Sequence, residues 1–362
     1  MEKKISLPFY LKASIILIGL LATIFIFYIA QGIIVPIIFS VILSIILHPV
    51  VIFFVRLKMP RVLAIIITLT ITFLIISGLG IFLFSQASRF IEKLPELVTK
   101  FSEFINQAIT WISGFIDVSP QKINIWISSR LENFITTGSA AIGKTIITVG
   151  SALVLLILIP VYIFLLLFYQ PLIIEFIYRL FGKDNSEQVA QILNLIKVLI
   201  QDYLVGLLIQ AGVIAVLYLT GLLILGIEYA ILLAVSGAFL NMIPYIGAII
   251  AAMLPMLMAV VTKPSPASAL LVLGLYVFIQ FIDNNILVPR IVASKVRLNA
   301  LTSIIVVFSF GLLWGIPGMF LSIPLTAIIK VICDQIEPLK PLGFLLGDTM
   351  PDEEKSLTSN MK

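Results

Sequence analysis

The sequence predicts an all-α integral membrane protein with about six full transmembrane helices and two re-entrant helical hairpins arranged as inverted repeats. Hydrophobic residues make up 61% of the 362 residues and charged residues only 11%, whereas soluble domains use about 25% charged residues. Apolar runs of about 20 residues recur, which is long enough to cross a hydrocarbon core of about 30 Å. Two further apolar runs, residues 230–261 and 301–332, are interrupted at their midpoints.

Six uninterrupted apolar runs predict the full spans. They cover residues 13–30, 33–55, 62–85, 146–168, 204–226 and 268–288. The first run is longer than the core of a secretory signal and lacks its cleavage site, so we expect an uncleaved first span.

Residues 86–145 have a different character from the spans. Their apolar side chains recur at steps of three and four, beginning at Phe90, Leu94 and Leu97, which is typical of an amphipathic helix. This segment predicts extracytoplasmic helices that lie at the membrane interface, form an oligomer interface or act as an external lid. Residues 170–203 form a second amphipathic stretch, with a turn at residues 182–186.

The two interrupted runs predict hairpins. The first is broken at Pro244, Tyr245 and Gly247, and the second at Gly315, Pro317 and Gly318. Proline removes a backbone donor, and glycine frees the chain to reverse. Arms of about 15 residues reach only about 22 Å, too short to cross the membrane. Two kinked pairs of full-length helices are the alternative.

The distribution of Lys and Arg predicts the orientation, because cytoplasmic loops collect basic residues. The amino-terminal lysines and the loop at Arg56, Lys58 and Arg61 are expected in the cytoplasm. If residues 230–261 form a hairpin that enters from outside, Arg290 and its basic neighbours also lie in the cytoplasm. The second hairpin then enters from the cytoplasm, so that both termini are cytoplasmic and the two span-plus-hairpin units are inverted repeats.

The predicted spans, hairpins and orientation divide the chain into five regions. They are residues 1–85 with three transmembrane helices, the extracytoplasmic segment 86–145, residues 146–203 with one span and cytoplasmic amphipathic helices, the transport core 204–334 and the cytoplasmic tail 335–362.

Polar side chains in the apolar second half are candidates for a substrate or ion pathway, since intramembrane ionisable groups are costly. Gln280, Asp283 and Asn284 lie three and four residues apart and are expected on one helix face. Asp283 alternatively reaches interfacial water near the helix end. Gln210 and Asn241 are expected either to face the same cavity or to bond between helices.

Several classes of function are disfavoured. The sequence has no phosphate-binding loop and no metal-ligand spacing, and its one histidine, His48, has no catalytic partners in the sequence. One cysteine, Cys333, allows no internal disulfide. The net charge of +5 comes mainly from short loops, so it does not indicate nucleic acid. We expect no enzyme activity, no cofactor and no bound metal.

Three blocks of sequence resemble signatures of the autoinducer-2 exporter family. They are Asn241 to Gly247 followed by Ala251 to Pro255, Gln280 to Ile291, and Gly315 to Pro324. Two positions depart from the family pattern: Asp283 stands where Glu is frequent, and Asn299-Ala300 where His-Pro is frequent. The resemblance implies export of small signalling molecules or metabolites, with sodium/proton exchange in some relatives.

We therefore expect a secondary transporter of the cytoplasmic membrane that moves a small polar molecule outward, with a proton or sodium as the coupling ion. A cation/proton antiporter that uses Asp283 and a non-transporting membrane scaffold remain open. The exposed apolar faces of the amphipathic stretches predict a homo-oligomer.

Overall fold

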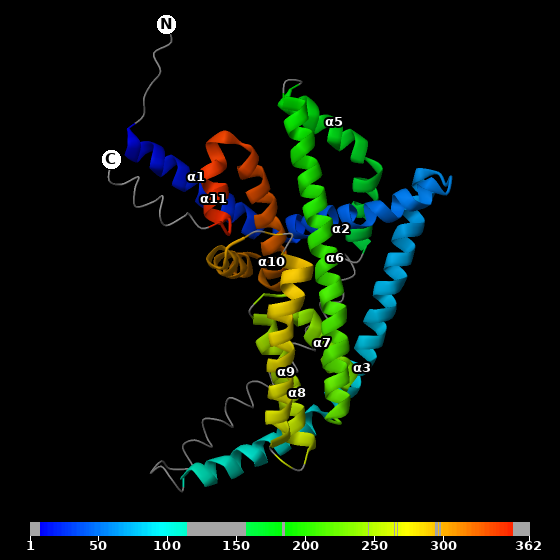
Figure 1. Cartoon of the computed structure of the whole chain (residues 1–362), viewed down its shortest axis with the longest axis vertical. Helices are drawn as coiled ribbons and strands as arrows, with labels where there is room; N and C mark the ends of the chain where they lie inside the picture. The colour runs from blue at the N-terminus through cyan, green and yellow to red at the C-terminus, as the bar shows by residue number, and fades with distance from the viewer. Residues whose placement is uncertain are drawn as a thin grey trace. The chain divides into compact units, whose positions relative to one another are not determined.

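The computed structural model describes residues 8–113, 157–182, 185–244, 246–263, 265, 267–293, 296 and 298–349 (Figure 1). Within these residues the fold is helical, and the only extended pairing is an isolated bridge between Leu298 and Gly347. The helices long and apolar enough to cross a membrane are α1 (Phe9–Ile29), α2 (Gln31–Arg56), α3 (Arg61–Ser113), α6 (Ser186–Ile224), α9 (Ala267–Ile282), which continues into the π-helix η2 (Asp283–Ala293), and α10 (Ala300–Gln335). The prediction of an all-helical membrane fold is confirmed.

Two helices run further than the sequence predicted. The span expected over residues 62–85 continues without a break to Ser113 in α3, and the span expected from residue 204 begins at Ser186 in α6. α6 contains no proline, and α3 continues through Pro95, so a change from apolar to amphipathic character does not end either helix. The part of the predicted amphipathic segment 86–145 beyond Ser113 and the start of the span 146–168 lie outside the described residues.

The chain divides into two compact units. The terminal unit contains residues 1–45, 158–198 and 297–362, and the central unit contains residues 46–157 and 199–296.

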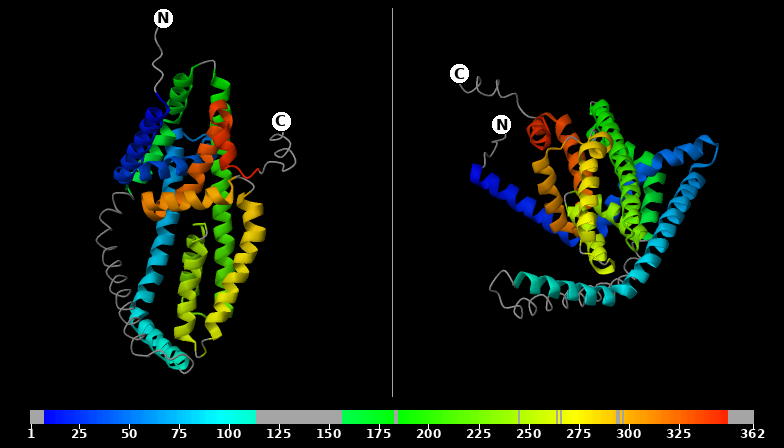
Figure 2. Two further views of the ribbon diagram at one scale, coloured as in Figure 1. Left: turned by 90° about the vertical axis from the view of Figure 1, so that its left-hand side faces the viewer. Right: turned by 60° about the horizontal axis from the view of Figure 1, so that its bottom comes forward.

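In the central unit, α7 (Ala230–Asn241) and α8 (Ile246–Thr262) form a hairpin of two short apolar helices. α8 packs against both α7 and α9, and these helices lie side by side in Figure 2. At the tip, the amide N–H of Ile243 donates to the carbonyl of Leu240 at 2.9 Å, which closes the turn. Gly247 follows directly, where an added Cβ would meet the carbonyl oxygen of Leu240.

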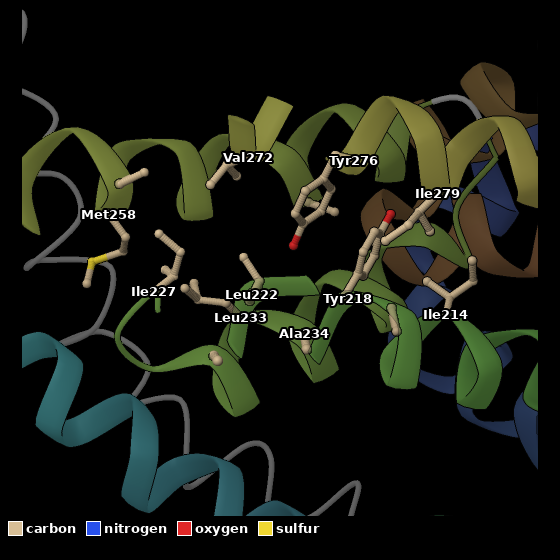
Figure 3. Packing of buried hydrophobic residues seen from close by; sticks show 14 of the residues in the cluster. Ile214, Tyr218, Leu222, Ile227, Leu233, Ala234, Met258, Val272, Tyr276 and Ile279 are labelled. Atoms are coloured by element: carbon tan, nitrogen blue, oxygen red, sulfur yellow. The ribbon is translucent and has the colours of Figure 1, made fainter. Parts of the chain in front are cut away.

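The core of the central unit lies where α6, α7, α8 and α9 meet (Figure 3). Tyr218 and Leu222 from α6, Ala234 from α7, Ala259 from α8 and Val272 from α9 are each fully buried. The small residues of α7 and α8 let the hairpin approach closely, as is typical of helices packed within a membrane.

In the terminal unit, α10 is interrupted at Gly315, which has φ 65° and ψ −146°. This region of conformational space is essentially restricted to glycine. Gly318 lies against the carbonyl of Phe310, so the chain turns back on itself at the break. The interruption predicted at residues 315–318 is therefore confirmed. Directly before it, the indole Nε1 of Trp314 donates to the carbonyl of Phe27 at 3.0 Å and ties α10 to α1.

The start of α10 is fixed by Asn299. Its Oδ1 accepts the N–H of Thr302 at 2.7 Å, which is an N-cap, and its Nδ2 donates to the carbonyl of Leu345 at 2.7 Å. Leu345 belongs to α11 (Lys340–Leu346), which follows the short 3₁₀ helix η3 (Glu337–Leu339).

The remaining helices of this unit, Ile157–Phe168 and α5 (Gln170–Phe181), meet at 64°.

The close approach at the hairpin tip gives a stability prediction. Gly247→Ala should destabilise the protein by about 1–3 kcal/mol, because the new methyl group meets backbone that cannot move aside. Gly274→Ala in α9 is the control, since an added Cβ there meets open space. Thermal unfolding of the two purified variants checks this expectation. Equal unfolding temperatures would contradict the tight tip.

Candidate transport site

Asp283 is a carboxylate buried within an apolar helix bundle. It is the first residue of η2, directly after α9, and its exposed fraction is 2%. Among the described residues it forms no ion pair with Lys or Arg. A buried carboxylate without a countercharge needs strong hydrogen-bond donors to remain in place.

Two amide side chains supply these donors. Nε2 of Gln210 donates to Oδ1 of Asp283 at 2.7 Å, and Nδ2 of Asn241 donates to Oδ2 at 2.9 Å. Gln210 lies midway along α6, and Asn241 is the last residue of α7, at the hairpin tip. The carboxylate therefore joins three helices through partners that are 73 and 42 residues away in the sequence.

The polar face predicted on α9 is divided in two. Asp283 points inward to Gln210 and Asn241, whereas Asn284 is exposed and accepts a 3.0 Å hydrogen bond from Nε2 of Gln280. The half-buried Gln280 marks the boundary between these sides. Positions three and four residues beyond it differ by about 100° around the helix, so they fall on opposite sides of that boundary.

The other predicted pathway residues lie at the two helix breaks. Pro244 is half-buried and Gly247 is buried at the tip that carries Asn241, while Tyr245 lies outside the described residues. In the terminal unit, Gly318 is buried, and Gly315 and Pro317 are exposed.

A pair of tyrosines that was not predicted from the sequence lies on the facing sides of α6 and α9. The rings of Tyr218 in α6 and Tyr276 in α9 stack with centroids 4.2 Å apart, and both are buried (Figure 3). Tyr276, Gln280 and Asp283 follow one another at steps of four and three, a spacing that could have revealed the shared face.

A cavity of about 410 Å³ lies beside α6 in the central unit. Gly206 and Ile209 line it, one turn or less from Gln210, together with Asp202 and Arg290. This volume suits a small molecule. The described residues contain no group of three or more His, Cys, Asp or Glu that could hold a metal ion.

Comparison with known proteins identifies the family of this chain. A family model described as AI-2E family transporter matches residues 17–337. This chain belongs to the AI-2E family of transporters. Family membership and the six helices of the described residues that are long and apolar enough to cross a membrane make it a multi-pass membrane protein of a transporter family.

Three relatives show how far the similarity extends. "AI-2 transport protein TqsA" of Escherichia coli (strain K12) is 28% identical over 341 residues, which cover 88% of this chain and 90% of TqsA. "Putative transport protein YhhT" of the same organism is 25% identical over 328 residues, covering 89% of this chain and 90% of YhhT. "Putative transport protein YueF" of Bacillus subtilis (strain 168) is 25% identical over 293 residues, covering 75% and 76%. All three names describe transport, which is consistent with the expectation that AI-2E proteins of this kind are not enzymes.

The shared carboxylate predicts energetic coupling between α7 and η2. In a double-mutant cycle, Asp283→Ala and Asn241→Ala should show a coupling of about 1 kcal/mol, because each variant removes the same hydrogen bond. Asp283→Ala alone should be the more destabilising change, since it also leaves the amide of Gln210 without its acceptor.

Thermal unfolding of the purified variants measures this coupling. Asn284→Ala is the matched control, because Asn284 is exposed and bonds to Gln280 instead. Additive effects of the Asp283 and Asn241 changes would show that the two side chains do not interact.

Proposed function

We propose that this chain is a secondary transporter that exports a small polar molecule across the cytoplasmic membrane. One observation carries the proposal: a carboxylate in an apolar bundle, bound by amides from α6 and from the tip of the α7–α8 hairpin. Intramembrane ionisable groups of this kind mark substrate or ion pathways. The name of TqsA makes AI-2 the first substrate to test.

The proposed pathway needs the α7–α8 hairpin to be re-entrant. Its arms contain 12 and 17 residues, so they span about 18 and 26 Å at a rise of about 1.5 Å per residue. Both lengths fall short of a hydrocarbon core of about 30 Å. A tip that ends inside the membrane is tolerated where it is buried in protein or lines a wet cavity.

The interrupted helix α10 supports a second hairpin. Its 36 residues would reach about 54 Å as one straight helix, far more than the membrane needs, and it is broken at Gly315. With the basic residues on the cytoplasmic side, this hairpin enters from the cytoplasm, the α7–α8 hairpin enters from outside, and both termini are cytoplasmic.

The cavity beside α6 suits the inner end of such a pathway. Its lining includes Ile209, which precedes Gln210 in α6, and Arg290, one of the basic residues that the charge rule assigns to the cytoplasm. A solute loaded there would meet the Asp283 carboxylate and its amides as the next polar groups along α6.

Transport measurements test the role of Asp283. Inside-out membrane vesicles that contain the wild-type chain should take up AI-2, and Asp283→Asn should lower the initial rate about tenfold or more, because an uncharged side chain loses the charge-assisted bonds. Asn284→Ala should transport at the wild-type rate. Wild-type transport by Asp283→Asn would remove this carboxylate from the pathway, and wild-type vesicles without uptake would argue against AI-2.

Cysteine accessibility tests the re-entrant hairpin. In a Cys333→Ser background, Pro244→Cys at the half-buried tip should react with a membrane-impermeant thiol reagent from one side of the membrane, whereas Ala234→Cys, buried in α7, should not. The tip should react because it borders the proposed wet cavity. A tip cysteine that never reacts from either side would contradict the proposed pathway.

A further inference from the structure

Three buried polar atoms of α6 and α9 have no hydrogen-bond partner among the described residues. They are the hydroxyl oxygens of Tyr218 and Tyr276 and the Oε1 atom of Gln280. Tyr218 has an exposed fraction of 0% and Tyr276 of 3%. Such atoms are rare in native proteins, and each requires a physical explanation.

These atoms lie on the facing sides of α6 and α9. Tyr276, Gln280 and Asp283 form one stripe on α9 and its continuation, and Gln210 and Tyr218 form the opposite stripe on α6. The Gln210–Asp283 hydrogen bond closes one end of this arrangement, and the stacked rings lie at the other. We call these five residues the polar seam.

The two tyrosine hydroxyls point in opposite directions along the polar seam. In Figure 3 the hydroxyl of Tyr218 points toward Ile279, one turn before Asp283, and that of Tyr276 points toward Leu222. The seam therefore extends from the carboxylate into the bundle.

The chemistry of the three atoms decides what can satisfy them. A tyrosine hydroxyl needs an acceptor for its hydrogen, while the Oε1 atom of Gln280 can only accept. A metal ion offers no acceptor to a hydroxyl hydrogen. Water donates and accepts, and buried water typically makes about three hydrogen bonds to such groups.

We propose that ordered water occupies the polar seam, bonded to Tyr218, Tyr276 and Gln280 and continuous with the Asp283 site. Tyr218 is then a positioning residue that holds this water on the Asp283 side of the seam, and Tyr276 holds water on the Leu222 side. The water-lined seam lengthens the pathway of the proposed function, and this consequence rests on that function.

The sign of a stability change tests the proposal. If water is bound, Tyr218→Phe and Tyr276→Phe remove a satisfied hydroxyl and should each lower the unfolding temperature of the full chain by about 2 °C or more. If the hydroxyls are truly unpartnered, the same changes remove a desolvated polar group and should raise it. A rise or no change in both variants overturns the proposal. Tyr10→Phe is the control, because this side chain is 68% exposed.

Radiolytic labelling gives a second test on the wild-type chain. X-ray pulses form hydroxyl radicals from water, so a buried side chain that touches bound water is labelled where it lies. Tyr218 and Tyr276 should be labelled, whereas Met258, which is buried in the same core and oxidises readily, should not. Labelling of the two tyrosines no higher than that of Met258 overturns the proposal.

Transport measurements distinguish a failure of the water-filled seam from a failure of the proposed transport function. In vesicles where the wild-type chain moves AI-2, Tyr218→Phe and Tyr276→Phe should slow the initial rate severalfold, and unchanged rates would remove the seam from the pathway. If the wild-type chain moves no AI-2 and no other small polar solute, the proposed function fails, while the stability and labelling results still decide whether the seam holds water.

Discussion

A carboxylate buried in an apolar bundle must be held by donors that the bundle itself provides. Asp283 meets this requirement with one amide on each oxygen, from Gln210 at 2.7 Å and Asn241 at 2.9 Å. Neutral donors stabilise the carboxylate without cancelling its charge, unlike a salt bridge with Lys or Arg. A solute or ion that approaches it therefore meets charge that no described side chain has neutralised.

The hairpin explains how an amide from a helix end reaches this depth. α7 contains only 12 residues, so its last residue, Asn241, lies at the level of residues midway along α6. The turn that follows satisfies its own backbone through the 2.9 Å bond from Ile243 to Leu240 and the 3.1 Å bond from Gly247 to Ile243. Backbone pairing of this kind is needed wherever a helix ends away from bulk water. The break in the helix and the polar site are thus parts of one structure.

Much of the fold could be predicted because its signals are local. Composition and apolar runs predicted the membrane helices, and Pro244, Gly247 and Gly315 marked the two breaks. The lengths of α3 and α6 could not be predicted from amphipathicity, since both helices continue where their polarity changes, and α3 continues even through Pro95.

The residues of the site could be predicted from the sequence, but the hydrogen bonds between them could not. Gln210, Asn241 and Asp283 stood out as polar residues in apolar helices, yet their convergence depends on the packing of α6, α7 and α9. Tyr218 and Tyr276 were hidden because tyrosine fits an apolar run as well as a polar face. Asn299 was noticed only as a departure from the family pattern, although it caps α10 and binds the chain near α11.

The unbroken course of α3 has a mechanical consequence. Its 53 residues correspond to about 80 Å of helix, of which the apolar part, Arg61–Ser88, accounts for about half. The same helix packs against α7 and α8. Because α7 and α8 pack against α3, a movement of the hairpin must be accommodated by α3, whose helical backbone continues, bent in Figure 1, beyond its apolar part to Ser113.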